Sequence, residues 1–239
     1  MTTTPEVVPI DRLELAFTPK PWAFADERRA DIDAYFAALQ REKPALWNGR
    51  VLLLHERNFA GGVFRGSYLE TDYASFAAWR HWGRPPAAVC DCFGAAAIMA
   101  ADGAFLLGVM GPHTANAGRI YFPCGTPDPK DIAGGQVDLD FSVGRELKEE
   151  TGFDIAEFTA EPGWTTVFDL PLIAHMKVLH HRESAEVLRD RMLGHLARAA
   201  AGTRRHPDRA RAGRFRSRDA ALRHRVPGAA VRHAIDFCP

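Results

Sequence analysis

The sequence has few cysteines, and their spacing argues against a zinc site. There are four in 239 residues, and only one residue separates Cys90 from Cys92. Structural zinc pairs usually have two to four residues between the thiols, and no second Cys/His pair follows at a matching distance. We therefore predict reduced thiols, partly in the core.

Long apolar runs are also missing. None approaches the roughly 18 residues needed to cross a membrane. The first six residues, Met-Thr-Thr-Thr-Pro-Glu, have neither a basic start nor an apolar stretch, so they do not resemble a signal peptide. We expect a cytoplasmic protein without membrane contact.

The chain has no net charge, but its charges are unevenly placed. Residues 198–239 hold eleven Arg, no Lys and three acidic residues. Apolar residues are sparse there and lack periodicity. Three explanations stay open for this segment: a disordered basic tail, a segment that binds nucleic acid or acidic partners, and the product of a shifted reading frame. We favour disorder over residues 201–239 and expect no nucleic-acid partner, since Phe215 and Phe237 are the only aromatic residues in the tail.

The rest of the chain has the composition of a folded protein, with 46% hydrophobic and 25% charged residues. Apolar periodicity and turn residues predict a mixed α+β fold, with an extended start over residues 1–24. Helices are expected at 26–40, with Asp26 as the cap, and at 73–82, 138–151 and 183–200. Strands are expected at 50–54, 63–68, 95–99, 105–110, 119–122, 164–169 and 173–179, with tight turns at Gly61-Gly62 and Asp102-Gly103. A loop is expected at 123–135.

Three glutamates lie on one face of the helix predicted at 138–151. Glu146, Glu149 and Glu150 have i, i+3, i+4 spacing, which brings their side chains together. Such like charges repel, so a cation should compensate them, and a hard divalent ion prefers the oxygen ligands that they supply. Arg145 is four residues before Glu149 and is placed to brace it. A solvated acidic surface is the plainer interpretation of three clustered glutamates alone.

The longer sequence around these glutamates decides between a metal site and a solvated acidic surface. Residues 145–153 read Arg-Glu-Leu-Lys-Glu-Glu-Thr-Gly-Phe. This string resembles the second half of the Nudix box, R-E-U-x-E-E-x-G-U, at every fixed position. The opposite face of the helix carries Leu139, Val143 and Leu147, which predicts packing on a sheet.

The resemblance implies a fold, a reaction and a set of roles. The fold would be a Nudix-like α/β/α sandwich with a mixed sheet. The reaction would be hydrolysis of a nucleoside diphosphate linked to another moiety. Glu146, Glu149 and Glu150 would bind Mg²⁺ or Mn²⁺, with a further ligand from the carbonyl of Gly125. Arg145 would orient a glutamate, and the catalytic set would be Glu149, Glu150 and Arg145.

The upstream half of the box departs from the family pattern. The early Glu should fall at Val137 and the early Gly at Asp131. The lead-in around Gly125 comes about six residues too early, so we infer an insertion of roughly residues 128–135. Asp138 would then either replace the early Glu or cap the helix, and capping is the expected role.

The flanks suggest a domain plan and a substrate class. We expect an N-terminal α/β extension over 1–90, a helix plus a β-hairpin, and a hydrolase domain over 91–200. Residues 43–51 resemble the N-terminal region of longer Nudix proteins, some associated with UDP-sugars, which makes a nucleotide-sugar the leading small-molecule substrate. The polar loop 113–118 is either a substrate contact or a plain connection. A homodimer stays open.

Two further questions stay open at the site. Glu149 and Glu150 are candidates for the general base, and Glu161, Glu183 and Glu186 are alternatives expected to be surface carboxylates. A Nudix-like module that binds a nucleotide without cutting it is the alternative function.

Overall fold

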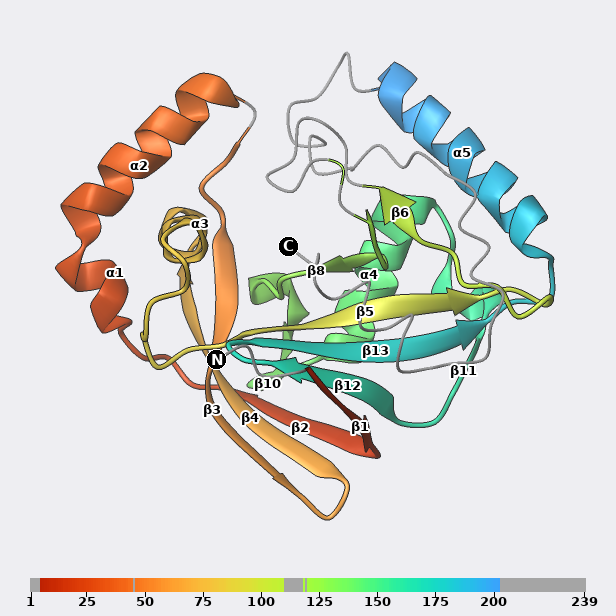
Figure 1. Ribbon diagram of the computed structural model, residues 1–239, viewed down its shortest axis with the longest axis horizontal. Coiled ribbons are helices and arrows are strands. Elements are labelled where there is room, and N and C mark those ends of the chain that lie inside the picture. Colours follow the sequence, from red (N-terminus) through yellow and green to blue (C-terminus); the bar gives the residue numbers. More distant parts are fainter. Residues whose placement is uncertain (1–4, 45, 110–117, 119, 203–239) are drawn as a thin grey trace.

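The computed structural model describes residues 5–44, 46–109, 118 and 120–202. Most of the polar loop 113–118 and the tail beyond residue 202 lie outside these ranges, so the predictions made for them stay predictions. The described chain is mixed α+β, as the periodicity predicted (Figure 1). Among the described residues, no helix is both long enough and apolar enough to span a membrane.

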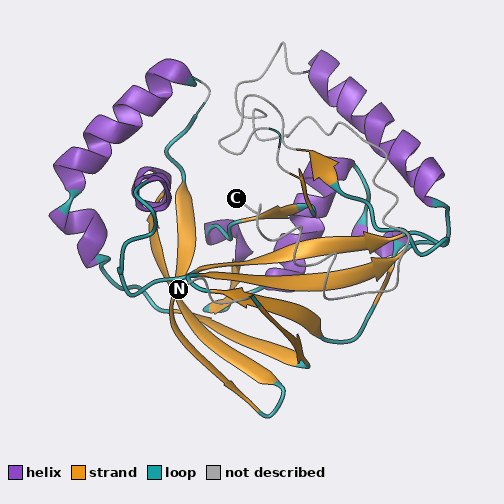
Figure 2. Cartoon of the chain, viewed as in Figure 1, coloured by secondary structure: helices purple, strands orange, loops and turns teal. Residues whose placement is uncertain are grey.

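A mixed sheet of six described strands forms the centre of the molecule (Figure 2). Its order is β1-β12-β13-β5-β8, and β11 pairs with β13 beside this path. The β13–β5 pair is parallel and the other pairs are antiparallel. The strands are β1 (Glu6–Ile10), β5 (Asp91–Met99), β8 (Cys124–Gly125), β11 (Thr159–Ala160), β12 (Trp164–Asp169) and β13 (Leu172–His180).

A second mixed sheet of five described strands has the order β3-β4-β2-β10-β9, with β2 and β4 parallel. Its strands are β2 (Arg12–Phe17), β3 (Arg50–Ala60), β4 (Val63–Asp72), β9 (Ile132–Ala133) and β10 (Gln136–Val137). The hairpin predicted around Gly61-Gly62 is confirmed, with strands longer than expected. A small pair, β6 (Gly108–Val109) with β7 (Ile120–Tyr121), completes the strands described.

The first 90 residues and the following hundred share both sheets. The N-terminal β1 pairs with β12, and β10, from the segment inferred as an insertion, pairs with β2. That segment also contains the short 3₁₀ helix η1 (Pro129–Asp131) and β9, so it is more structured than the loop we expected. The N-terminal region therefore contributes strands to the same sheets on which the acidic helix packs.

The helices follow the predicted order with two changes at the first one. They are α1 (Ala23–Glu27), α2 (Arg29–Glu42), α3 (Tyr73–His81), α4 (Leu139–Thr151) and α5 (Ala185–Gly202), with a 3₁₀ turn, η2 (Ile155–Glu157), after α4. The helix predicted at 26–40 is divided at Arg28, whose φ of −111° and ψ of 20° depart from the helical values. Asp26 lies inside α1, whose N-cap position is Trp22, so the predicted cap is wrong.

The strand predicted at 105–110 is also largely wrong. The turn at Asp102-Gly103 forms, and Met99 bridges Phe105. The returning segment then leaves β5, because residues 123–125 already occupy the next positions along that edge. The Ala96 amide donates to the Pro123 carbonyl, and Gly94 and Ala95 pair with β8. The chain instead forms β6 after a gap.

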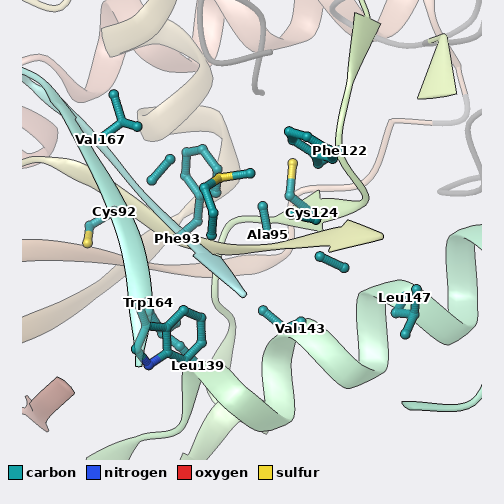
Figure 3. Close-up of a cluster of buried hydrophobic side chains, with 14 of the residues drawn as sticks. Cys92, Phe93, Ala95, Phe122, Cys124, Leu139, Val143, Leu147, Trp164 and Val167 are labelled. Carbon is teal, nitrogen blue, oxygen red and sulfur yellow. The ribbon is translucent and has the colours of Figure 1, made fainter. Parts of the chain in front are cut away.

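One large core joins the two sheets and α4 (Figure 3). Leu139, Val143 and Leu147 are buried on the face of α4 that was predicted to pack on a sheet. Figure 3 shows this face turned toward the strand that carries Phe93 and Ala95. A Cβ on Gly94 would lie 2.6 Å from a Val143 methyl, so glycine there lets the helix approach the strand closely. The packing fixes the opposite face of α4, the acidic one.

Candidate functional site: an acidic cluster on α4

The two ends of α4 form as its sequence indicates. The Asp138 side chain accepts a hydrogen bond of 2.9 Å from the Phe141 amide, which confirms the capping role over the early-Glu role. Gly152 ends the helix with a φ of 79°, a left-handed conformation that favours glycine. These two boundaries fix where the helix begins and ends, and the packing of its apolar face fixes the direction of the acidic one.

Arg145 is held by a buried aspartate, Asp131, which is not among the residues predicted for the site. Its Nε and Nη2 donate to Asp131 at 3.1 and 2.8 Å, and the Asp131 side chain is fully buried. The Asp128 amide and the Ser142 hydroxyl donate to the same carboxylate. The negative partners of Arg145, chiefly Asp131, raise the pKa of the guanidinium despite its burial. Arg145 is thereby locked as a permanent cation next to the glutamates.

From this anchored position Arg145 contacts the cluster directly. Its Nη1 donates to Glu146 Oε1 at 2.7 Å and lies 3.8 Å from Glu149 Oε1. The predicted bracing of Glu149 is thus present but is the looser of the two contacts. Glu149 has about half of its side chain exposed (49%), whereas the side chain of Glu146 is 13% exposed. Glu149 is therefore the cluster carboxylate most open to a ligand or to water.

Glu150 is the buried member of the cluster. The Cys124 amide donates to its Oε2 at 3.2 Å, and the Tyr121 hydroxyl donates to its Oε1 at 3.3 Å. Burial raises the pKa of Glu150 well above the ordinary value, and repulsion from Glu146 raises it further, more than these two hydrogen bonds lower it. The folded site thus disfavours the ionised form of Glu150, and a bound cation would offset that cost.

Gly125 lies against the same cluster, from the strand β8. A Cβ built on Gly125 would lie 2.5 Å from Cδ and 2.9 Å from Oε2 of Glu146, much closer than side chains approach one another. A side chain at position 125 would displace the Glu146 carboxylate from its present place. The structure therefore brings together all the residues predicted for the site: Gly125, Arg145, Glu146, Glu149 and Glu150.

The donor chemistry of this cluster fits a hard divalent cation. Within the described residues, no three His, Cys, Asp or Glu side chains form a ready-made group for a metal ion. Mg²⁺ and Mn²⁺ nevertheless prefer carboxylate and carbonyl oxygens, which are the groups gathered here. The close approach of Glu146 to the Gly125 backbone and the raised pKa of Glu150 both fit such an ion.

The other acidic candidates lie elsewhere on the surface. Glu161 pairs with His180, and Glu183 pairs with Arg191, with side chains about half exposed. Glu186 is 79% exposed. These positions agree with the surface role expected for them.

Asp131 is the residue that sequence reasoning missed at this site. The fixed spacing of the Nudix box places a glycine at position 131, so Asp131 is a departure from that pattern. A local signal was present, because Asp128 and Asp131 form a reciprocal capping box around η1, with a proline at its first position. That motif predicts a turn that folds Asp131 back toward the chain, although not its contact with Arg145.

No family model matches the chain, and no curated protein matches it. The likeness to the Nudix box therefore stands on residues 145–153 and on the contacts around them.

Exchanging Gly125 for alanine provides a direct test of the cluster. We expect Gly125→Ala to push the Glu146 carboxylate aside and to weaken Mg²⁺ or Mn²⁺ binding by roughly tenfold or more. The matched control is Gly144→Ala, because its new methyl would meet Ile155 at an ordinary 3.5 Å. In the control, metal affinity should stay constant while the helix gains about 0.5–1 kcal/mol. Calorimetric titration of both variants measures the difference, and equal metal affinities would contradict the assigned role of Gly125.

Proposed function

We propose that this chain is a metal-dependent hydrolase of the Nudix type, which cleaves the diphosphate bond of a nucleoside diphosphate linked to another moiety. The observation that carries the proposal is the cluster on α4. There, Glu146 lies on the Gly125 backbone, Glu150 is buried against the Cys124 amide, and Glu149 is open to solvent. A surface helix with a merely solvated acidic face would have no reason to bury Glu150.

The residues of the cluster have distinct parts in this proposal. Glu146, Glu149 and Glu150, with the Gly125 carbonyl, would hold Mg²⁺ or Mn²⁺. When bound, the ion neutralises charge on the diphosphate and lowers the pKa of a water molecule. Arg145 keeps Glu146 in place through its own anchor, Asp131. Glu149, half exposed, is the carboxylate best placed to accept a proton from an attacking water.

The finer fold assignment belongs to the same proposal. We propose that residues 91–200 form a Nudix-like α/β/α sandwich and that residues 1–90 are an N-terminal extension. Support comes from α4 packing on β5 and from the parallel β13–β5 pair at the centre of the larger sheet. N-terminal strands belong to both sheets. Deletion of residues 1–90 should therefore prevent the rest of the chain from folding.

A hydrolysis screen tests the reaction. Purified full-length protein is incubated with nucleoside-diphosphate compounds, nucleotide-sugars first, with Mg²⁺ or Mn²⁺ and with chelator. We expect metal-dependent release of two phosphate-bearing products, and its loss in Glu149→Gln. If a folded, metal-loaded protein turns over none of the substrates, the hydrolase assignment is wrong.

A nucleotide-binding module without catalysis is the second candidate. It is favoured by the observation that the described residues hold no ready-made metal-binding group and that Arg145 already neutralises part of the cluster. It predicts saturable nucleotide binding, measured by calorimetry, that is equal with metal and with chelator and unchanged in Glu149→Gln.

A further inference from the structure

A pocket lies away from the acidic cluster, between β3 and the loop that follows α3. Its volume is about 440 Å³, within the range of small-molecule sites. None of its lining residues belongs to the α4 cluster. Its walls are mainly apolar, with Trp79, Val89 and Leu170 among them, and its charged lining residues are Glu56, Arg57 and Arg84, beside His55.

A bulge in β3 makes His55 part of this lining. The register between β3 and β4 shifts between Leu54 and Glu56, so His55 is the extra residue with no partner across the ladder. Its side chain is only 4% exposed, yet neither ring nitrogen has a hydrogen-bond partner among the described residues. The nearest carboxylate, Glu56, lies 3.6 Å from Nδ1. Buried polar groups are nearly always hydrogen-bonded, so this imidazole lacks a partner that a ligand would supply.

The opposite wall is a fixed loop. Both Arg84 and Ala88 have a φ of 52°, which is unfavourable for residues with a side chain. The indoles of Trp79 and Trp22 hold the loop by donating to the carbonyls of Pro85 and Ala87, at 2.9 and 3.0 Å. Strained conformations held by surrounding contacts are typical of binding sites.

The charges that face the pocket favour an anion. Arg57 lies against the thiol of Cys90, to which its Nη1 donates at 3.2 Å, and it forms no salt bridge with a carboxylate of the described residues. The buried Nε of Arg84 has no hydrogen-bond partner within the described residues. Behind the lining, Asp91 is fully buried, neither of its carboxylate oxygens has a hydrogen-bond partner among the described residues, and burial raises its pKa to about 6. The charge of Asp91 is shared between Arg80 and Arg84, so it compensates Arg84 only in part.

We propose that this pocket binds a small organic anion, whose oxyanion head lies on Arg57 and Arg84 with His55 as a third partner and whose apolar body packs along Trp79, Val89 and Leu170. The bulge that brings an imidazole without a described hydrogen-bond partner into one pocket lining with two arginines is the juxtaposition that carries the proposal. The head is a carboxylate or a phosphate, which share this recognition chemistry. The site is independent of the diphosphatase proposal, because it shares no residue with the acidic cluster.

Benzoate, phenyl phosphate and neutral benzamide are the probes that test it. Each is titrated into the full-length protein up to roughly 10 mM, and chemical-shift changes in two-dimensional NMR report binding. We expect at least one of the two acids to bind and benzamide to bind at least tenfold more weakly. Binding of benzoate alone identifies a carboxylate head, and binding of phenyl phosphate alone identifies a phosphate head.

Two arginine variants locate the site. Arg57→Gln and Arg84→Gln should each weaken binding of the acid by roughly tenfold. Arg65→Gln is the matched control, since Arg65 is an exposed arginine on the neighbouring strand that pairs with Glu14. It should leave the affinity within about twofold. Arg57 is exposed, so its variant should fold even if the Arg84 variant does not. The proposal is overturned if neither acid binds, if benzamide binds as tightly, or if Arg57→Gln behaves like the control.

Discussion

Replacing Glu150 by glutamine should abolish hydrolysis and, at the same time, stabilise the metal-free protein. The loss of activity should be on the order of 100-fold or more, because a buried ligand charge disappears. The free energy of unfolding at pH 8 should rise by roughly 1–2 kcal/mol, since the variant no longer buries a carboxylate that is repelled by Glu146. Glutamine can keep both contacts: its carbonyl accepts from the Cys124 amide, and its NH₂ faces the Tyr121 hydroxyl, which can accept.

The pH dependence distinguishes this effect from a general gain in packing. Burial raises the pKa of Glu150 in the folded state, so the protonated form is favoured there and stability falls as pH rises above the unfolded value of 4.5. The advantage of Glu150→Gln should therefore be small at pH 4 and largest at pH 8. Denaturant unfolding at several pH values, in chelator, measures it.

Added Mg²⁺ or Mn²⁺ should make the wild type more stable than Glu150→Gln. Mg²⁺ or Mn²⁺ that binds the folded wild type stabilises it by mass action, whereas Glu150→Gln should gain much less. Glu149→Gln is the control, because its side chain is half exposed and its loss should leave metal-free stability nearly unchanged. A Glu150→Gln protein that is less stable than wild type at pH 8 in chelator would contradict the inference that ionisation of Glu150 is unfavourable in the folded state.

Local signals in the sequence predicted the parts of the site that α4 itself determines. Its cap at Asp138, its stop at Gly152 and its apolar face at Leu139, Val143 and Leu147 all follow from residues within the helix. The proximity of Gly125 to Glu146 came from the family resemblance, because no local pattern links two residues so far apart.

Long-range pairing set the parts that could not be predicted. The short strand β1 finds its partner in β12, more than 150 residues away, and β10 extends a sheet begun at β2. Asp131 reaches Arg145 because η1 and the β9–β10 turn fold back under α4. The fixed spacing of the Nudix box does not predict this contact. An insertion changes the position of a residue in the sequence, but the residue can still lie at the site.

Asp131→Asn should be the most destabilising single change at the site. Asp131 accepts from two Arg145 nitrogens, from the Asp128 amide and from the Ser142 hydroxyl, all without solvent exposure of its side chain. An asparagine turns an NH₂ group toward some of these donors and removes the main acidic partner of the buried Arg145. Breaking a buried pair from one side costs about 3–5 kcal/mol, and thermal or denaturant unfolding should show a loss of roughly 3 kcal/mol.

A purely structural aspartate would affect stability alone, whereas a residue that positions Arg145 should also affect metal binding. On folded Asp131→Asn, well below its unfolding midpoint, we expect Mg²⁺ or Mn²⁺ affinity to fall by roughly 10–100-fold, because the released guanidinium moves against Glu146 and Glu149. Asp33→Asn is the control: its pair with Arg29 is exposed at 3.5 Å, and it should change neither quantity noticeably. Unchanged metal affinity in folded Asp131→Asn would reduce Asp131 to a stabilising contact and would remove the link between the loop before α4 and the chemistry of the cluster.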